Sequence, residues 1–406
     1  MSATVEDTKI ADPLREAERG VVRPAESDSA RADAFLPSPC VQNHAANIMP
    51  LPGGDLGCVW FGGTQEGIPD ISVCFSRLPA GGDRWSDPVK LSDDPTRSEQ
   101  NPILFPAPDG RLWLLWTAQV SGNQDTAVVR RRISTDNGRS WGPVELLFDT
   151  VGTSGVFVRH PPAVLDNGDI LLPIFYCHGR PGEKWVGNHD TSAVRISADG
   201  GRSWQEYEVP DSTGCVHMDV SQLRDGSLLA LFRSRWADNI YSSRSADRGR
   251  TWSPPAPTEL PNNNSSIQFT RLANGHLALV FNDTNAEGVT ERRASLYDDI
   301  EDESGAELKE PVAKPGERQA VWGVPRAPMT LAVSEDDGRT WPYKRNLEVG
   351  DGYCMTNNSR EQLNREYSYP SIKQGPDGLL HIAFTYFRQA IKYVRVPEEW
   401  VRAGRP

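Results

Sequence analysis

An eight-residue pattern, S-x-D-x-G-x-[ST]-W, recurs four times in this chain and constrains its fold more than any other feature. The copies occupy residues 134–141, 197–204, 245–252 and 334–341. A pattern this specific does not recur four times by chance, so the chain contains a structural repeat. A degenerate fifth copy is visible around Asp83 and Trp85.

The residue types in this pattern indicate a tight turn between two strands. An Asp carboxylate accepts hydrogen bonds from nearby backbone N–H groups, and Gly supplies a positive φ angle. We expect the Trp to pack the turn against its own sheet. The four Asp residues are therefore predicted to be structural and not catalytic.

A second repeat, a Gly-containing turn followed by an apolar strand, occurs six times. The turns contain Gly54, Gly110, Gly168, Gly226, Gly275 and Gly378. With 35 Gly and 32 Pro in the chain, these turns indicate many short strands and few helices. Six units of about four strands each predict an all-β fold, a six-bladed β-propeller, with the eight-residue pattern in its turns.

The even spacing of the repeats also predicts the domain organisation. Residues 1–34 are polar and lack an apolar stretch, so we expect a disordered N-terminal arm there and one propeller domain over residues 35–406. The interval before the last repeat is much longer than the others, which predicts an acidic loop insertion at about residues 283–319. Loops of this length are usually functional or disordered.

The net charge of the chain argues against two classes of binding partner. The formal net charge is −12, which argues against binding to nucleic acid or to an anionic membrane, since both need clustered Lys and Arg. No apolar run approaches the length of a membrane span, and the N-terminal segment lacks the features of a secretory signal. We therefore expect a cytoplasmic protein with no cofactor and no metal. The sequence does not indicate the oligomeric state.

The eight-residue pattern is similar to the Asp-box, or BNR repeat, of the sialidase (neuraminidase) superfamily. The resemblance extends over about residues 39–396 and implies a propeller that acts on a sugar. In that family three arginines bind the substrate carboxylate, a tyrosine activated by a glutamate is the nucleophile, and an aspartate is the acid/base. A neutral phenol suits the nucleophile because an anionic substrate does not repel it.

Three positions match the family. Arg233 ends an apolar strand and Arg326 precedes the last Asp-box, so the resemblance implies that both bind the substrate carboxylate. Tyr369 begins a Tyr-x-x-apolar strand in the last repeat, which implies the nucleophile. Arg235 is a near alternative to Arg233, and Tyr367, a near alternative to Tyr369, is also a candidate for substrate binding.

Two positions depart from the family. His44 stands where the family has its first arginine, and His217 stands where it has the glutamate. Neutral His can still accept a phenolic proton, and its ordinary pKa suits proton transfer, so both remain catalytic candidates. The candidates for the acid/base are Glu66 and Asp70, in the loop after the second strand of the first repeat.

Further polar residues lie just upstream of the apolar strands that are expected to line the central channel. We predict that three of them contact the substrate, namely Arg97, Asn101 and Arg159. The alternative is that such residues only fill the channel through hydrogen bonds. As a group they indicate a binding site.

These candidates allow three interpretations, each with a carbohydrate as partner. The first is a sialidase-like exo-glycosidase that acts on a terminal, anionic sugar. The second is a uronate lyase, in which arginine neutralises the carboxylate while His or Tyr abstracts the C5 proton. The third is a non-catalytic sugar-binding propeller, since a fold alone does not give a function.

Overall fold

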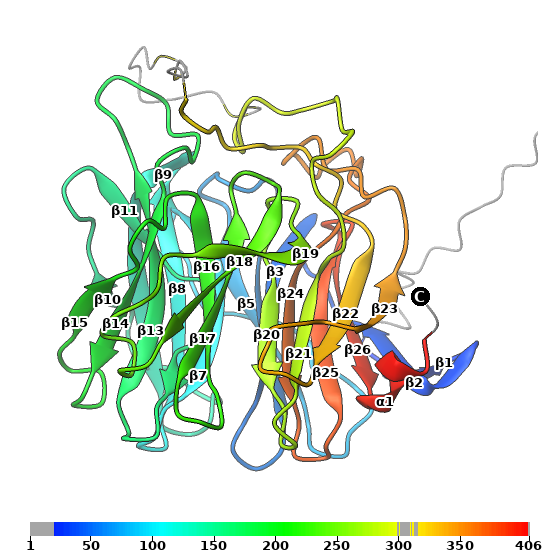
Figure 1. The fold of residues 1–406 in the computed structure, drawn as a ribbon. Helices are drawn as coiled ribbons and strands as arrows, with labels where there is room; N and C mark the ends of the chain where they lie inside the picture. Colours follow the sequence, from blue (N-terminus) through cyan, green and yellow to red (C-terminus); the bar gives the residue numbers. More distant parts are fainter. Residues whose placement is uncertain (1–19, 299, 301–308, 310, 312–315, 405–406) are drawn as a thin grey trace, which may run out of the picture.

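Six β-sheets are arranged in a ring around a central channel (Figure 1). The computed structural model describes residues 20–298, 300, 309, 311 and 316–404. Each sheet is antiparallel, and the first strands of blades four, five, six, one and two contact one another in turn around the channel. The prediction of an all-β, six-bladed propeller is confirmed.

The first three blades follow one another in chain order. Blade one contains β3 (Gln42–Pro50), β4 (Leu56–Gly63), β5 (Ser72–Leu78) and β6 (Val89–Lys90). Blade two contains β7 (Ser98–Pro106), β8 (Leu112–Val120), β9 (Asn123–Ser134) and β10 (Glu145–Phe148). Blade three contains β11 (Ser154–Phe157), β12 (Ala163–Val164), β13 (Ile170–His178), β14 (Thr191–Ser197) and β15 (Gln205–Glu208), with β11 and β12 both paired to β13.

The last three blades complete the ring. Blade four contains β16 (Cys215–Gln222), β17 (Leu228–Ser234), β18 (Asn239–Ser245) and β19 (Ala256–Pro261). Blade five contains β20 (Gln268–Arg271), β21 (Leu277–Asn282), β22 (Met329–Ser334) and β23 (Tyr343–Glu348). Blade six contains β24 (Tyr367–Gln374), β25 (Leu380–Tyr386) and β26 (Ala390–Val396), followed by α1 (Glu399–Arg402).

The outer strands of blade six come from the other end of the chain. Strand β2 (Asp28–Phe35) pairs antiparallel with β26, and β1 (Arg23–Ala25) pairs with β2. Residues 20–34 therefore differ from the expected disordered arm, whereas residues 1–19 of that arm lie outside the described residues. An outer strand needs few apolar side chains because one face is solvated, so its sequence carries little hydrophobic signal.

The six glycine turns join the first and second strands of each blade, as the sequence predicts. In every turn the glycine N–H donates to the carbonyl three residues earlier, as from Gly110 to Ala107 and from Gly226 to Leu223. All six glycines have positive φ, between 79° at Gly378 and 92° at Gly54. Other residues rarely adopt this backbone conformation, which explains the regular glycines.

The four Asp-boxes have one common hydrogen-bond pattern. In the first, Oδ1 of Asp136 accepts from the N–H groups of Arg139 and Ser140 at 3.1 and 2.8 Å, while Oδ2 accepts from the Ser140 hydroxyl at 2.5 Å. The Ser134 hydroxyl donates to Oδ1 and accepts from the N–H of Gly138. These bonds hold the pKa of Asp136 below its ordinary value. The boxes at Asp199, Asp247 and Asp336 repeat the pattern.

The Asp-box tryptophans link neighbouring blades, which corrects the expectation that each packs against its own sheet. Trp141, in the turn between β9 and β10 of blade two, lies 6.4 Å from Phe75 of blade one between ring centroids. Trp204, in the turn between β14 and β15 of blade three, lies 5.7 Å from Phe148 of blade two. A large ring at this position buries apolar surface of two blades at once. The tryptophan therefore fixes one blade on the blade before it.

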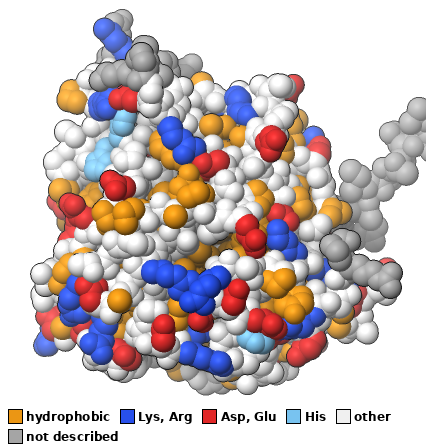
Figure 2. Space-filling model, viewed as in Figure 1, with side chains coloured by type: hydrophobic (Ala, Val, Ile, Leu, Met, Phe, Trp, Pro, Cys, Tyr) orange, Lys and Arg blue, Asp and Glu red, His pale blue; other side chains and the backbone are white. Residues whose placement is uncertain are grey.

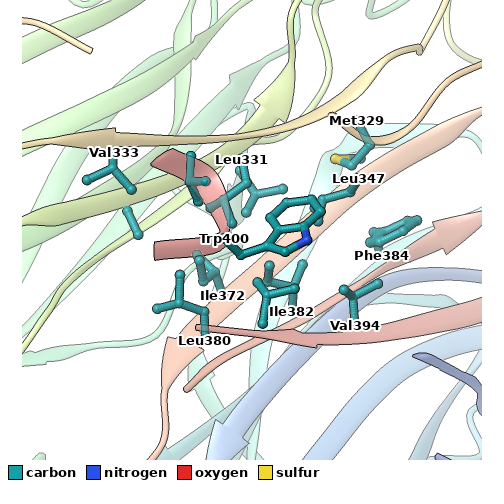
Figure 3. Packing of buried hydrophobic residues seen from close by; sticks show 14 of the residues in the cluster. Met329, Leu331, Val333, Leu347, Ile372, Leu380, Ile382, Phe384, Val394 and Trp400 are labelled. Atoms are coloured by element: carbon teal, nitrogen blue, oxygen red, sulfur yellow. The ribbon is translucent and has the colours of Figure 1, made fainter. Parts of the chain in front are cut away.

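The two blades without a full Asp-box use other tryptophans for the same purpose. Trp85 of the degenerate copy lies 5.3 Å from Tyr393, which connects blade one to blade six. Trp400 of α1 packs between Leu331 of blade five and Ile382 of blade six (Figure 3). Its indole N–H also donates to Asp28 at 2.7 Å. The described chain thus contains one such tryptophan for each of its six blades.

The predicted insertion connects β21 to β22 and runs across one end of the propeller (Figure 1). Residues 299, 301–308, 310 and 312–315 of it lie outside the described residues. On the side of the propeller seen in Figure 2, acidic and basic side chains are interspersed. Among the residues that the structure describes, no helix is long and apolar enough to cross a membrane.

Candidate functional site

The innermost strands of four blades each contain a β-bulge at the end of the channel that the insertion covers. Each bulge contains a non-glycine residue with positive φ, namely Ala45 (60°), Asn101 (50°), His217 (50°) and Tyr369 (50°). Such a backbone costs about 1 kcal/mol or more, and it redirects side chains out of the strand alternation. The bulges place His217 and Tyr369 in one buried cluster.

Tyr369 lies at the centre of this cluster. Its phenol oxygen accepts a hydrogen bond of 2.6 Å from Nη1 of Arg233, and the ring is only 4% exposed. The ring centroids of His44 and His217 lie 4.3 and 5.6 Å from that of Tyr369. The guanidinium carbon of Arg326 lies 5.6 Å from the same ring. The cluster therefore combines a phenol, two imidazoles and several cations.

Arg233 connects Tyr369 to blades four and five. Its Nε donates to Oδ1 of Asn264 at 2.8 Å, and its Nη1 lies 3.4 Å from Nε2 of His217. Burial lowers the pKa of Arg233 to about 10, so the group stays charged at neutral pH. Burial and the nearby Arg233 charge hold the pKa of His217 well below its ordinary value. His217 is therefore a neutral imidazole beside a guanidinium.

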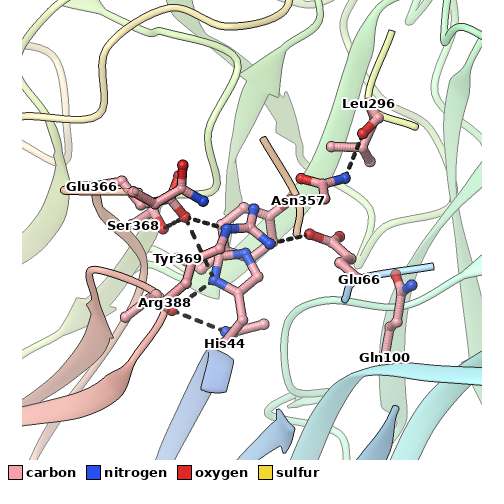
Figure 4. A network of polar contacts seen from close by, with 12 residues as sticks. His44, Glu66, Gln100, Leu296, Asn357, Glu366, Ser368, Tyr369 and Arg388 are labelled. Atoms are coloured by element: carbon pink, nitrogen blue, oxygen red, sulfur yellow. Dashed lines mark hydrogen bonds and ion pairs between the residues drawn. The ribbon is translucent and has the colours of Figure 1, made fainter. Parts of the chain in front are cut away.

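A second group of charges lies on the other side of Tyr369 (Figure 4). Arg388 donates from Nε to Glu366 at 2.7 Å and from Nη1 to Glu66 at 2.6 Å. Arg326 donates to the same Glu366 at 3.2 Å, and Ser368 adds a hydrogen bond of 3.0 Å. Burial opposes the charged forms, yet the two arginines hold the pKa of Glu366 below its ordinary value. Glu366 is thus an ionised anchor for both cations.

His44 lies between Tyr369 and this ionic group. Its Nδ1 is 2.8 Å from the Thr385 hydroxyl and 3.9 Å from Glu366. Burial, with the charges of Arg388 and Arg326, holds the pKa of His44 well below its ordinary value. This imidazole is also neutral at physiological pH, and it does not supply the positive charge of an arginine.

Arg159 spans the channel beneath Tyr369. Its Nη2 donates to the backbone carbonyls of Ala46, Tyr369 and Pro370 at 3.1 to 3.2 Å, and its Nε donates to Ser266 at 3.1 Å. The guanidinium carbon lies 5.2 Å from the Tyr369 ring centroid. Burial lowers its pKa to about 10. Arg159 therefore fixes the Tyr369 backbone and adds positive charge below the ring.

Four buried nitrogen atoms of the cluster have no hydrogen-bond partner within the described chain. They are Nη1 of Arg159, Nη2 of Arg233, Nε2 of His44 and Nδ1 of His217. Buried polar atoms are nearly always satisfied, so these atoms are suited to contact a ligand. Around Tyr369 four guanidinium groups face two carboxylates. This excess of positive charge favours an anionic ligand, and a carboxylate matches the planar guanidinium fork.

Three predicted residues, Asp70, Arg97 and Tyr367, have their hydrogen-bond partners outside this cluster. The exposed carboxylate of Asp70 accepts from the N–H and hydroxyl of Thr64, inside its own loop. Arg97 donates to the carbonyls of Ala118 and Thr126, so it braces blade two. The phenol of Tyr367 donates to the Val349 carbonyl, because the bulge turns only Tyr369 towards the channel. Asn101 occupies the bulge of blade two.

Sequence reasoning missed Arg388 and did not select Glu366 from the residues before β24. Arg388 lies in the hairpin between β25 and β26, at the same end of the propeller as Tyr369. The Glu66 loop is the equivalent hairpin of blade one, between β4 and β5. A search of this hairpin in every blade would have found Arg388. Arg235, the alternative to Arg233, pairs with Asp190 at 2.7 Å instead.

The insertion covers the cluster. The Val321 carbonyl accepts from Asn264 at 2.8 Å, and Trp322 lies under the guanidinium of Arg233 at 5.6 Å. On the opposite side, the Tyr297 phenol accepts from Gln124 at 2.9 Å and from Gln119 at 3.2 Å. These contacts explain why the polar side chains of the cluster are almost fully buried.

Six blades, Asp-box turns and a tyrosine among arginines define a sialidase-like propeller. Residues 54–382 match the family described as "BNR repeat-like domain", so the chain belongs to that family. No curated protein sequence matches the chain.

Solved structures with the same fold are distant in sequence. The Hadza microbial sialidase Hz136 is 13% identical, with a TM-score of 0.66 over 89% of this chain and 67% of that chain. The intramolecular trans-sialidase from Ruminococcus gnavus, in complex with oseltamivir carboxylate, is 12% identical, with a TM-score of 0.63 over 89% and 96%. A protein of unknown function from Dyadobacter fermentans is 15% identical, with a TM-score of 0.64 over 92% and 98%. At these identities the likeness shows the fold alone.

Proposed function

We propose that this protein is a sialidase-like exo-glycosidase that acts on a terminal, anionic sugar of a glycan. The observation that carries the proposal is the 2.6 Å hydrogen bond from Arg233 to the Tyr369 phenol, inside a cluster of four buried arginines. A phenol oxygen that accepts from a guanidinium is stabilised as it gains negative charge. This makes Tyr369 the best nucleophile of the site.

In this proposal the arginines bind the sugar carboxylate and Tyr369 attacks the anomeric carbon. The neutral His217 accepts the phenolic proton, in place of the glutamate that the family has there. Glu66 protonates the leaving oxygen and then deprotonates the water that releases the sugar from Tyr369. The sequence of two displacements retains the anomeric configuration. His44 and Arg159 hold the ring and the backbone of Tyr369 in place.

Two solved structures of the same fold support a carboxylate ligand. One is a trans-sialidase in complex with oseltamivir carboxylate, and another is the Trypanosoma rangeli sialidase in complex with sialic acid. The second is 13% identical to this chain, with a TM-score of 0.57 over 94% of this chain and 57% of that chain. The excess of buried positive charge around Tyr369 is the feature of this chain that fits such a ligand.

The state of the histidines and carboxylates favours a second candidate, a uronate lyase. Both His44 and His217 are neutral, and each has a buried nitrogen without a partner in the described chain. Glu66 and Glu366 are both paired with Arg388. In a lyase the arginines would stabilise the enediolate, His217 or Tyr369 would take the C5 proton, and no carboxylate nucleophile would be needed.

A two-channel assay separates these functions. Purified protein is incubated with aryl α-sialosides and with uronate-containing oligosaccharides, while aryl release and the ultraviolet absorbance of an unsaturated uronate are recorded. Aryl release that Tyr369→Phe abolishes supports the glycosidase. An unsaturated product that His217→Ala or His44→Ala abolishes supports the lyase and overturns the glycosidase. Binding of these sugars without either product would leave a sugar-binding propeller.

A further inference from the structure

The link between β2 and β3 contains a cysteine that lies against the side of blade one. Cys40 belongs to this link, which leads from the outer part of blade six to the innermost strand of blade one. A Cβ atom at position 62, on β4, would lie 3.0 Å from the Cys40 sulfur, so the thiol lies directly over the backbone of Gly62. The missing side chain at Gly62 therefore makes room for the Cys40 thiol.

A second cysteine lies on the same face of blade one. In the antiparallel pair of β4 and β5, Cys74 lies opposite Trp60. Trp60 and Gly62 are two residues apart on β4, so they share one face of the sheet, and Cys74 is a diagonal neighbour of Gly62 on that face. The Cys74 thiol donates a hydrogen bond to the Cys40 sulfur. The two sulfur atoms are therefore direct neighbours.

The two thiols differ in exposure and in acidity. Cys40 is partly exposed, whereas Cys74 is 4% exposed. The hydrogen bond from Cys74 lowers the pKa of Cys40, and the charge of Lys90 adds to this, although burial and the charge of Asp70 oppose it. Of the six cysteines, all of which lie in the described chain, Cys40 alone has a lowered pKa and alone is not buried. Oxidants react first with such a thiol.

We propose that Cys40 and Cys74 are a redox-sensitive pair that forms a reversible disulfide when the protein meets a peroxide. The Cys40 thiolate attacks one peroxide oxygen and becomes a sulfenic acid, while the other oxygen leaves as hydroxide and takes up a proton to form water. The Cys74 sulfur then attacks the Cys40 sulfur, and the sulfenic hydroxyl leaves with the Cys74 proton as a second water. Each sulfur loses one electron, and both electrons reduce the peroxide.

The disulfide would lie at the junction of blades six and one. Asn43, at the start of β3, donates from Nδ2 to the carbonyls of Cys40 and Gln389 at 2.8 and 3.0 Å. Its N–H donates to the Arg388 carbonyl at 2.7 Å, so the link is already bound to the hairpin between β25 and β26. A bond from Cys40 to β5 would close a loop of residues 40–74 and restrict the unfolded chain. The oxidised protein should therefore be the more stable form.

Peptide mass spectrometry after mild oxidation tests the bond directly. The intact protein is treated with a small excess of hydrogen peroxide, and its remaining thiols are then alkylated under denaturing conditions before digestion. We expect a cross-linked pair of peptides that contain Cys40 and Cys74, and we expect dithiothreitol to separate them. Cys58→Ser, at a buried cysteine of β4, is the matched control and should keep the cross-link. Cys74→Ser should leave Cys40 as a sulfenic acid that dimedone traps.

Thermal unfolding measures the effect of the bond on the fold. We expect the oxidised wild type to unfold about 3–6 °C above the reduced wild type. Peroxide should not raise the unfolding temperature of Cys40→Ser. The mass spectrometry is done on the wild type, so the test stays decisive even if a variant fails to fold.

Several results would overturn the inference. Oxidation of Cys40 to the sulfinic acid while Cys74 is still alkylated would show that the two sulfurs do not pair. A cross-link from Cys40 to Cys58, or to another cysteine, would contradict the assigned partner. A cross-link that leaves the unfolding temperature unchanged would contradict the stabilising role of the bond. None of these measurements needs a sugar, so the proposed function can fail or stand independently of them.

Discussion

The two ends of the propeller are built from the same antiparallel strands, but they differ in what repeats from blade to blade. At the turn end, the Asp-boxes repeat one set of residues and one set of hydrogen bonds in four places. At the channel end, four bulges repeat one backbone conformation, yet its residue is Ala45, Asn101, His217 or Tyr369. At the turn end the same residue types repeat, and they fix one turn conformation. At the channel end the same backbone conformation repeats, while the residue that adopts it differs from blade to blade.

This difference explains why the sequence predicts the Asp-box turns and does not predict the bulges. A turn must satisfy its own backbone locally, so Asp and Gly recur at fixed spacing. A bulge at the channel is stabilised by the surrounding blades, as where Ala45 donates its N–H to Thr385 of blade six. Its side chain is then free to vary with function.

The largest effect should come from the centre of the channel. We expect Tyr369→Phe to lower kcat at least about a thousandfold, because it removes the proposed nucleophile while its ring packing survives. Steady-state kinetics on the substrate found in the two-channel assay measures this. Tyr176→Phe is the matched control, since its phenol bonds to Glu206 on the outer part of blade three. Equal losses in both variants would contradict the assignment.

The second-largest effect should be on the free energy of unfolding and not on kcat. We expect Trp341→Ala to lower the free energy of unfolding by about 3–5 kcal/mol, because the ring is 2% exposed and packs between blades four and five. Chemical denaturation measures the loss, and Trp341→Phe should recover much of it. The folded variant should keep its kcat. A large loss of kcat with little loss of stability would contradict the purely structural role of the Asp-box tryptophans.

A smaller effect should depend on pH. Backbone N–H groups and the Thr340 hydroxyl hold the pKa of Asp336 below its ordinary value, although burial opposes this. Its stabilisation is therefore present above pH about 4 and is lost as the pH falls through the lowered value. We expect Asp336→Asn to cost about 1 kcal/mol at pH 7 and less in acid. Asp87→Asn, at an exposed position outside the four Asp-boxes, is the control in the same denaturation experiments.

The smallest effect should distinguish two adjacent alanines. Ala45 has a φ of 60° and Ala46 does not share this conformation, although both are fully buried. Glycine relieves strain only at the bulge, so we expect Ala45→Gly to change the free energy of unfolding by less than about 0.5 kcal/mol. Ala46→Gly should cost about 1 kcal/mol. Equal changes in thermal denaturation would show that the bulge is unstrained.

Most of the fold could be predicted because its signals are local. The glycine turns predicted the number of blades, and the Asp-box pattern predicted tight turns between strands. Strand β2 escaped prediction because only two of its eight residues, Ala32 and Ala34, are buried. The packing of Trp141 on Phe75 was missed because it depends on a neighbouring blade. Contacts between blades leave no pattern in a single sequence.

The site could be predicted only where a strand pattern pointed to it. Arg233, Arg326 and Tyr369 precede or end recognisable strands, and the structure brings them together. Arg388 lies in a hairpin without a repeated motif, so nothing local distinguishes it. Tyr367 was a reasonable candidate until the bulge separated it from Tyr369, since strand alternation would place both on one face.

The closing of the ring by β2 has a consequence for the order of assembly. Glu366, Tyr369 and Arg388 all lie in or beside blade six, which combines β2, a strand that precedes blade one, with three strands that follow blade five. A chain in which only blades one to five have formed has an unpaired β2 edge and lacks these three residues. The strand edge that pairs last therefore completes the blade that holds Tyr369, so closure of the ring and formation of the candidate site are one step.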